Sequence, residues 1–144
     1  MAKRKVFVSF DYENDRKFKY LLEAWDANDD FEFCFNDMSS DEIKTSSISV
    51  VKQKLSQKIN AATYTLVLVG KEANQEHKDA REIGYRNWIN YEIAKSKEYG
   101  NKLVAVKLEK NCTSPDELLG SGASWAYSFS QEAIINALKN AANR

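Results

Sequence analysis

Residues 63–108, TYTLVLVGKEANQEHKDAREIGYRNWINYEIAKSKEYGNKLVAVKL, contain the pattern that decides the fold. The apolar runs at 63–69 and 103–108 are continuous rather than alternating, which is typical of strands covered on both faces. Residues 87–99 between them have a helical pattern, and Gly100 is well placed to end that helix. A strand, a helix and a strand in this order predict a parallel pair joined by a right-handed crossover.

Three further strand patterns lie outside this unit. Residues 5–10, KVFVSF, form a short β-branched and aromatic run, and residues 125–127 could form a last short strand. Residues 31–35, FEFCF, alternate strictly and place three phenylalanines on one side. Such alternation is typical of a half-exposed strand at a sheet edge, and it makes the phenylalanine stripe a core face rather than a ligand cage.

Apolar residues recur at helical spacing in three segments between and after these strands. The segments and their candidate N-cap residues are 18–25 with Asp11 or Asn14, 48–59 with Ser46 or Ser47, and 134–141 with Ser130. The charged residues 71–86 show no periodicity. A stretch of this length in a compact domain is usually a functional loop or hides a short helix.

This alternation of strands and helices predicts an α/β fold of the flavodoxin-like kind. We expect a three-layer sandwich around a central parallel sheet in the order 2-1-3-4-5, with the alternating strand at the edge. The sequence shows no internal repeat, linker or low-complexity tract. Residues 1–144 are therefore predicted to form a single domain.

The composition limits the classes of partner. Acidic and basic residues number 21 each, so the formal net charge is +0. A neutral chain has no overall electrostatic attraction to nucleic acid or to anionic lipid, and we expect neither as a partner. No stretch approaches the ~20 apolar residues that span a bilayer, and no signal-peptide pattern follows the first residues.

The cysteines and the histidine carry no metal-site pattern. Cys34 and Cys112 do not form a C-x-x-C pair, so both are predicted to be free thiols in a cytoplasmic protein. His77 is the single histidine and lies far from any cluster of cysteines, which argues against a zinc site. Its polar surroundings predict an exposed loop residue, and we expect no metal ion.

The fold places the ligand site at the carboxyl ends of strands one and three, beside the point where the strand order reverses. Residues 9–12, 36–40 and those after Gly70 follow the relevant strands. The glycine-rich phosphate-binding motifs and the nucleophile elbow are absent from the sequence. Asp11, Asp37 and Asp41 could suggest a receiver-like acidic pocket, but the third strand ends in Gly70 where a receiver requires an aspartate.

One pattern on the helix after strand three carries chemistry. Trp88-Ile89-Asn90-Tyr91-Glu92 has the form W-x-x-x-E, and residues at i and i+4 share a helix face. An indole and a carboxylate are thus presented side by side. The alternative is an interfacial tryptophan beside a solvated Glu92 that pairs with Lys95, and the spacing alone favours that alternative.

The context of this motif resembles Toll/interleukin-1-receptor (TIR) domains. The opening stretch VFVSFDYEND at 6–15 is similar to their first conserved box, and W-x-x-x-E resembles the segment that carries their catalytic glutamate. Residues 86–96, followed by Gly100-Asn101, look especially like the TIR-like proteins of Thoeris anti-phage systems. The resemblance covers about residues 4–110 and the final helix. The chain lacks the proline loop of receptor-adaptor TIR domains, since Pro115 is its only proline.

The resemblance implies an enzyme that cleaves the nicotinamide–ribose bond of NAD, with NAD as substrate and no resident cofactor. Glu92 would be the catalytic residue. The expected substrate contacts are Ser9 or Asp11 to ribose or amide, Phe10 and Trp88 to nicotinamide, and Asp37. Local alternatives stay open, since Trp88 could serve packing, Asp11 a helix cap and Asp37 a turn.

The resemblance also implies a cyclic or modified ADP-ribose that a separate effector senses, and self-assembly through the domain's own surfaces. Two rival functions remain. One is a non-enzymatic TIR-like interaction module, and the other is an enzyme similar to nucleoside deoxyribosyltransferases, which share the α/β layout and a glutamate-driven glycosidic chemistry.

Overall fold

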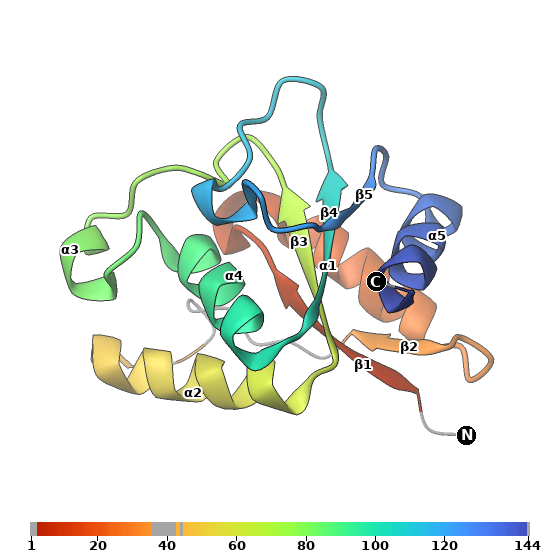
Figure 1. Ribbon diagram of the computed structural model, residues 1–144, viewed down its shortest axis with the longest axis horizontal. Helices are drawn as coiled ribbons and strands as arrows, with labels where there is room; N and C mark the ends of the chain where they lie inside the picture. Colours follow the sequence, from red (N-terminus) through yellow and green to blue (C-terminus); the bar gives the residue numbers. More distant parts are fainter. Residues whose placement is uncertain (1–2, 36–42, 44, 144) are drawn as a thin grey trace.

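The computed structural model describes residues 3–35, 43 and 45–143, and five of its strands form one sheet (Figure 1). The strand order is β2-β1-β3-β4-β5, and all four neighbouring pairs are parallel. The strands are β1 (Arg4–Ser9), β2 (Phe33–Phe35), β3 (Tyr64–Val69), β4 (Lys102–Lys107) and β5 (Ser124–Ala126). This arrangement confirms the predicted α/β fold and its 2-1-3-4-5 order.

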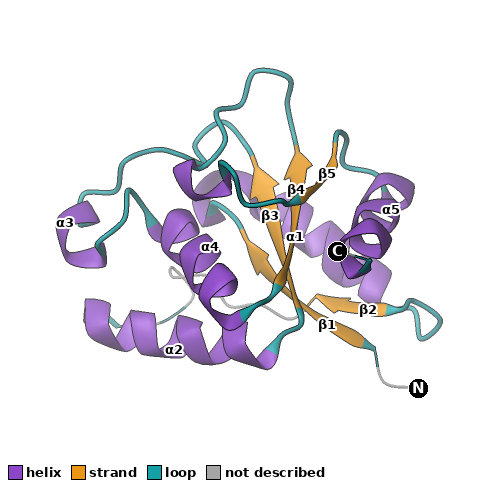
Figure 2. Ribbon diagram, in the orientation of Figure 1, coloured by secondary structure: helices purple, strands orange, loops and turns teal. Residues whose placement is uncertain are grey.

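Helices connect the strands and cover the sheet (Figure 2). They are α1 (Tyr12–Asp26), α2 (Ile48–Ala61), α3 (Ala80–Ile83), α4 (Trp88–Tyr99), the 3₁₀ helix η1 (Asp116–Leu118) and α5 (Gln131–Ala142). Side chains cap the four long helices, and the capping residues are Asp11, Ser47, Asn87 and Ser130. Gly100 ends α4 with a φ of 76°, in the left-handed region that favours glycine.

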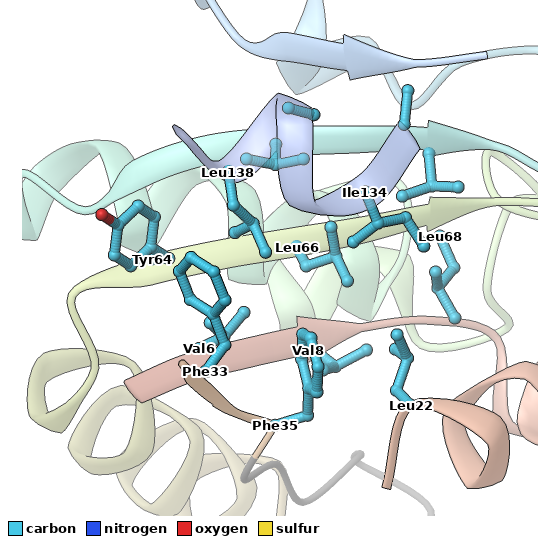
Figure 3. Close-up of a cluster of buried hydrophobic side chains, with 14 of the residues drawn as sticks. Val6, Val8, Leu22, Phe33, Phe35, Tyr64, Leu66, Leu68, Ile134 and Leu138 are labelled. Carbon is cyan, nitrogen blue, oxygen red and sulfur yellow. The ribbon is translucent and has the colours of Figure 1, made fainter. Parts of the chain in front are cut away.

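The helices lie on both faces of the sheet because successive strand residues point to opposite faces. Leu22 of α1 and Leu138 of α5 pack in a single cluster with one side of the sheet, which Figure 3 shows around Leu66. Helices α2 and α4 cover the other side, where their apolar residues form two further clusters. The predicted three layers are therefore present.

Strands β1, β3, β4 and β5 lie within one residue of their predicted bounds, and β2 is shorter than predicted. The edge strand β2 begins at Phe33 rather than at residue 31, because only Phe33, Cys34 and Phe35 pair with β1. The phenylalanine stripe is nevertheless buried, with Phe31, Phe33 and Phe35 all in the core. The charged stretch 71–86 does contain a short helix, α3, and the rest of it is irregular. Within the described residues, no helix has the length and apolarity needed to cross a bilayer.

A buried carboxyl group sits against the end of β3. Asp15 of α1 is only 6% exposed, and its Oδ2 atom has no hydrogen-bond partner among the described residues. It lies directly against Gly70, where an added Cβ would overlap with the carboxylate and displace it. Burial, reinforced by the charges of Asp11 and Glu109, raises the pKa of Asp15 from 3.8 to about 6.

Asp15→Asn is expected to stabilise the protein at neutral pH. Because the folded-state pKa lies above the unfolded value, stability falls as pH rises from about 4 to about 6, and the ionised group remains unfavourable above that range. The neutral amide removes a penalty of about 1–3 kcal/mol. Urea denaturation at pH 4 and pH 7.5 measures this difference, which should vanish at pH 4. Asp29→Asn, at an exposed site, is the matched control. A variant less stable than the parent at pH 7.5 would contradict the argument.

Candidate functional site

A cavity of about 450 Å³ opens at the carboxyl end of β1, beside the beginning of α4. This is the edge of the sheet where the strand order reverses, as the sequence predicted for a ligand site. Three segments line it: the start of α1, the stretch after β3, and the start of α4. The lining residues are Phe10, Asp11, Tyr12, Glu13, Asn14, Glu72, Gln75, Glu76, His77, Asn87, Trp88 and Ile89.

The residues at and after the end of β1 differ in their surroundings. Ser9 is fully buried and does not line the cavity; its hydroxyl donates a hydrogen bond to Glu92. Phe10 lines the cavity although it is only 5% exposed. Asp11 lines the cavity and also caps α1, accepting hydrogen bonds from the Glu13 backbone and the Asn14 amide at 3.1 and 2.6 Å. The capping alternative for Asp11 is therefore present together with a place at the cavity.

Glu92 lies inside the protein. Its side chain is 3% exposed, and Oε1 accepts the Ser9 hydroxyl at 2.6 Å. This excludes the alternative of a solvated glutamate on the helix surface; Lys95, its expected partner there, lies 3.0 Å from Glu98. A short O–H···O bond to an acid in a buried setting is among the stronger hydrogen bonds of proteins. The sheet and α4 thus hold one carboxyl oxygen in a fixed position.

Trp88 lines the cavity and also packs against neighbouring side chains. It is the first residue of α4, is half-buried, and lines the cavity. Its indole packs edge-on against the Tyr91 ring at 5.5 Å and belongs to the margin of the core cluster under α2. One helical turn therefore separates an aromatic wall of the cavity from the buried carboxylate of Glu92.

Buried polar contacts fix α4 on the sheet. Besides the Ser9–Glu92 bond to β1, the hydroxyls of Thr65 and Ser96 lie 2.6 Å apart and join α4 to β3. Ser96 also lies 2.7 Å from the Glu92 carbonyl, to which it donates. Buried hydroxyls that lose their partners carry a desolvation penalty of about 1–3 kcal/mol, so these contacts define the position of α4 as well as its stability.

Asn87 holds the stretch after β3 over the start of α4. Its amide group donates to the carbonyl oxygens of Ala73 and Gln75, both at 2.9 Å. Its Oδ1 atom accepts the Asn90 backbone N–H at 2.9 Å and so caps α4. The Asn90 side chain in turn accepts the Glu117 N–H of η1 at 2.9 Å. One wall of the cavity is therefore tied to α4 by amide side chains.

Sequence reasoning missed most of the polar lining. Glu72, Gln75, Glu76 and His77 all come from the charged stretch after β3, whose length was the available signal of a functional loop. His77 lies in a loop as predicted, but it is half-buried and lines the cavity; its Nδ1 atom accepts the Asp79 N–H at 2.9 Å. Asp37 lies outside the described residues.

Two further features concern reactive side chains. Cys34 and Cys112 are both free and half-buried. In residues 3–35, 43 and 45–143, no group of three or more His, Cys, Asp or Glu side chains is placed to hold a metal ion.

The parallel sheet, its strand order and the W-x-x-x-E helix beside the cavity define an α/β protein of the TIR-like class. Comparison with protein families specifies the class further. The chain belongs to the family described as Thoeris protein ThsB, TIR-like domain, whose model matches residues 7–113. That match begins within β1 and ends in the segment after β4, so it includes the whole cavity lining. No curated protein matches the chain.

Asn87→Asp is expected to loosen the cavity wall. The aspartate carboxylate can still cap α4. Its second oxygen, however, would face the carbonyl oxygens of Ala73 and Gln75, to which the Asn87 amide donates in the parent. Leaving buried carbonyls unsatisfied beside a charge should lower the free energy of unfolding by about 2–3 kcal/mol. Denaturation measures the loss, and hydrogen exchange should accelerate in residues 72–77. Asn136→Asp, at an exposed site on α5, controls for the added charge. Unchanged hydrogen exchange in residues 72–77 would show that the Asn87 hydrogen bonds do not hold this segment.

Proposed function

We propose that this protein cleaves the bond between nicotinamide and ribose in NAD, with Glu92 as the catalytic residue. The observation that carries the proposal is the Glu92 carboxylate, buried and fixed by Ser9, one helical turn from a cavity with Phe10 and Trp88 in its walls. Membership of the Thoeris TIR-like family supports a role in defence. Cleavage of NAD is our proposal for the reaction that serves this role.

The chemistry requires a fixed negative charge near the ribose. When the C1′–N bond breaks, both bonding electrons leave with nicotinamide, which becomes neutral, and the ribose becomes oxocarbenium-like. A carboxylate stabilises that positive charge, and its effect is large in a site that excludes water. Because nicotinamide is a good leaving group, the step needs little acid catalysis. Water or a nucleophile within the same molecule then attacks C1′ and loses a proton.

Glu92 must gain access to the substrate. It is not among the described residues that line the cavity, and only 3% of it is exposed. The described arrangement is therefore a resting one under this proposal, in which the carboxylate lies behind the cavity wall. Trp88 and Ile89 of the first turn of α4 both line the cavity, and each lies about one helical turn from Glu92, so we propose that a shift of this turn exposes the carboxylate to the cavity.

The products and partners form part of the same proposal. Attack by an internal nucleophile gives a cyclic ADP-ribose, and attack by water gives ADP-ribose; a cyclase must exclude water until the ring closes. NAD is a substrate here rather than a resident cofactor. We propose that the product is a signal sensed by a separate effector in the cytoplasm, and that self-assembly of this chain controls the site.

Glu92→Gln is expected to abolish nicotinamide release. The glutamine amide keeps the shape of the side chain and can still contact Ser9, but it lacks the negative charge. Loss of one group that stabilises transition-state charge typically lowers an enzyme's rate by at least about 100-fold, and we expect a fall of that size here. Chromatography of NAD incubated with concentrated protein measures release. Glu98→Gln, an exposed site on the same helix, should retain activity. Equal release by the parent and Glu92→Gln would rule out Glu92 as the catalyst.

Ser9→Ala tests whether Ser9 positions the carboxylate. We expect kcat to fall about tenfold while KM stays within about twofold, because the hydroxyl orients Glu92 and does not line the cavity. Ser124→Ala removes another buried hydroxyl, in β5, and should leave both constants unchanged. A matching fall in both variants, or a rise in KM alone for Ser9→Ala, would contradict a positioning role.

A further inference from the structure

A chain of side-chain hydrogen bonds crosses the protein interior and ends on the backbone of Glu92. Its members are Asn101, which directly precedes β4, Thr65 of β3 and Ser96 of α4. The Asn101 amide lies 3.2 Å from the Thr65 hydroxyl, and that hydroxyl lies 2.6 Å from the Ser96 hydroxyl. Ser96 then donates to the Glu92 carbonyl oxygen at 2.7 Å. Because Thr65 and Ser96 are fully buried, water cannot take the place of either hydroxyl.

Asn101 begins this chain as a donor. Gly100 ends α4 in the left-handed region and turns the backbone, so that the Asn101 N–H donates to the Ser96 carbonyl at 2.9 Å. The Asn101 side chain lies 2.9 Å from the carbonyl oxygen of Ile59 in the last turn of α2. A carbonyl oxygen only accepts, so the group that faces it must be the amide NH₂. The second hydrogen of that NH₂ group is then available to Thr65.

The bonds of the chain all point in one direction. A hydroxyl group has a single hydrogen to donate. Ser96 gives its hydrogen to the Glu92 carbonyl and must therefore accept from Thr65. Thr65 in turn gives its hydrogen to Ser96 and accepts from Asn101. Hydrogen bonds aligned in this way polarise one another, and each is strengthened by roughly 10–30%.

Glu92 is thereby held at both its side chain and its backbone. Ser9 of β1 donates to the carboxylate, and Ser96 donates to the carbonyl in addition to the helical N–H bond. Ser9 and Thr65 lie on the neighbouring parallel strands β1 and β3. A serine hydroxyl bonded to the carbonyl four residues earlier often bends a helix slightly. The strength of the Ser96 bond therefore affects where the Glu92 backbone lies relative to the sheet.

We infer that Asn101, Thr65 and Ser96 are positioning residues that set the backbone of Glu92 through this directional chain. None of the three is among the described residues that line the cavity. The consequence for catalysis rests on the proposed function, because it requires Glu92 to be the catalytic residue. Under that function the chain affects the rate of bond cleavage rather than the binding of NAD, since a displacement of about 1 Å at a reacting group can lower a rate by about 100-fold.

A double-mutant cycle tests the chain without any assay of activity. Asn101→Ala and Ser96→Ala remove the two side chains that bond to Thr65, and urea denaturation gives the unfolding equilibrium constant of each variant and of the pair. We expect the two effects to deviate from additivity by at least about threefold, and by no more than about twofold when Thr65→Val is also present. Asn101→Ala combined with Ser124→Ala, which removes a buried hydroxyl in β5, should be additive within about twofold. Additivity of the first pair would overturn the inference.

The carbonyl ¹³C resonance of Glu92 tests whether the chain reaches that residue. Thr65→Val removes the central hydroxyl and keeps the size of the side chain, so it should shift this resonance by weakening the Ser96 bond. Thr65→Ser keeps the hydroxyl and should restore the parent resonance. Val104→Ala removes core packing in β4, in the cluster on the other side of the sheet, and should leave the resonance unchanged. A parent-like resonance in Thr65→Val, or equal shifts in Thr65→Val and Thr65→Ser, would overturn the inference.

An NAD cleavage assay on the same variants separates this inference from the proposed function. We expect Thr65→Val to lower kcat by at least about threefold with KM within about twofold, and Thr65→Ser to keep both constants within about twofold. Cleavage by the parent with an unchanged kcat in Thr65→Val would overturn the positioning role and leave the enzyme standing. Non-additivity and a shifted Glu92 resonance without cleavage by the parent would support the chain and count against the enzyme.

Discussion

The hydrogen bond from Ser9 to Glu92 is the contact on which the candidate site depends. It joins residues 83 positions apart in sequence, one at the end of β1 and the other on α4, and both are almost completely buried. A buried carboxylate without a partner is costly, so the fold must bring β1 and α4 together in register for Glu92 to be tolerated inside. The same register places Phe10 and Trp88 in the walls of one cavity.

The rest of the site follows from the position of α4. The Thr65–Ser96 contact fixes the middle of the helix on β3, and Asn87 fixes its first turn under the stretch after that strand. Helix α4 thereby connects the buried Glu92 to Trp88 in the cavity wall. All of these contacts therefore involve one helix.

The two buried acids, Glu92 on α4 and Asp15 on α1, differ in their hydrogen bonding. Glu92 has a hydroxyl donor at 2.6 Å, whereas Asp15 has an oxygen without a partner and a pKa raised to about 6 by burial and by neighbouring carboxylates. Asp15 therefore lowers stability at neutral pH, and its carboxyl group occupies the space that a Cβ at Gly70 would take.

The sequence by itself determined the sheet, because continuous apolar runs, an alternating edge strand and the capping residues are local signals that the fold obeys. It also supplied Phe10, Trp88 and Glu92 through a resemblance to a family. Only the tertiary structure decided that Glu92 is buried against Ser9 rather than solvated, since helical spacing is the same in both cases. It also decided that Asp11, Glu72 and Glu76 line one cavity, because they lie in different segments that come together only when strands β1 and β3 end at the same edge.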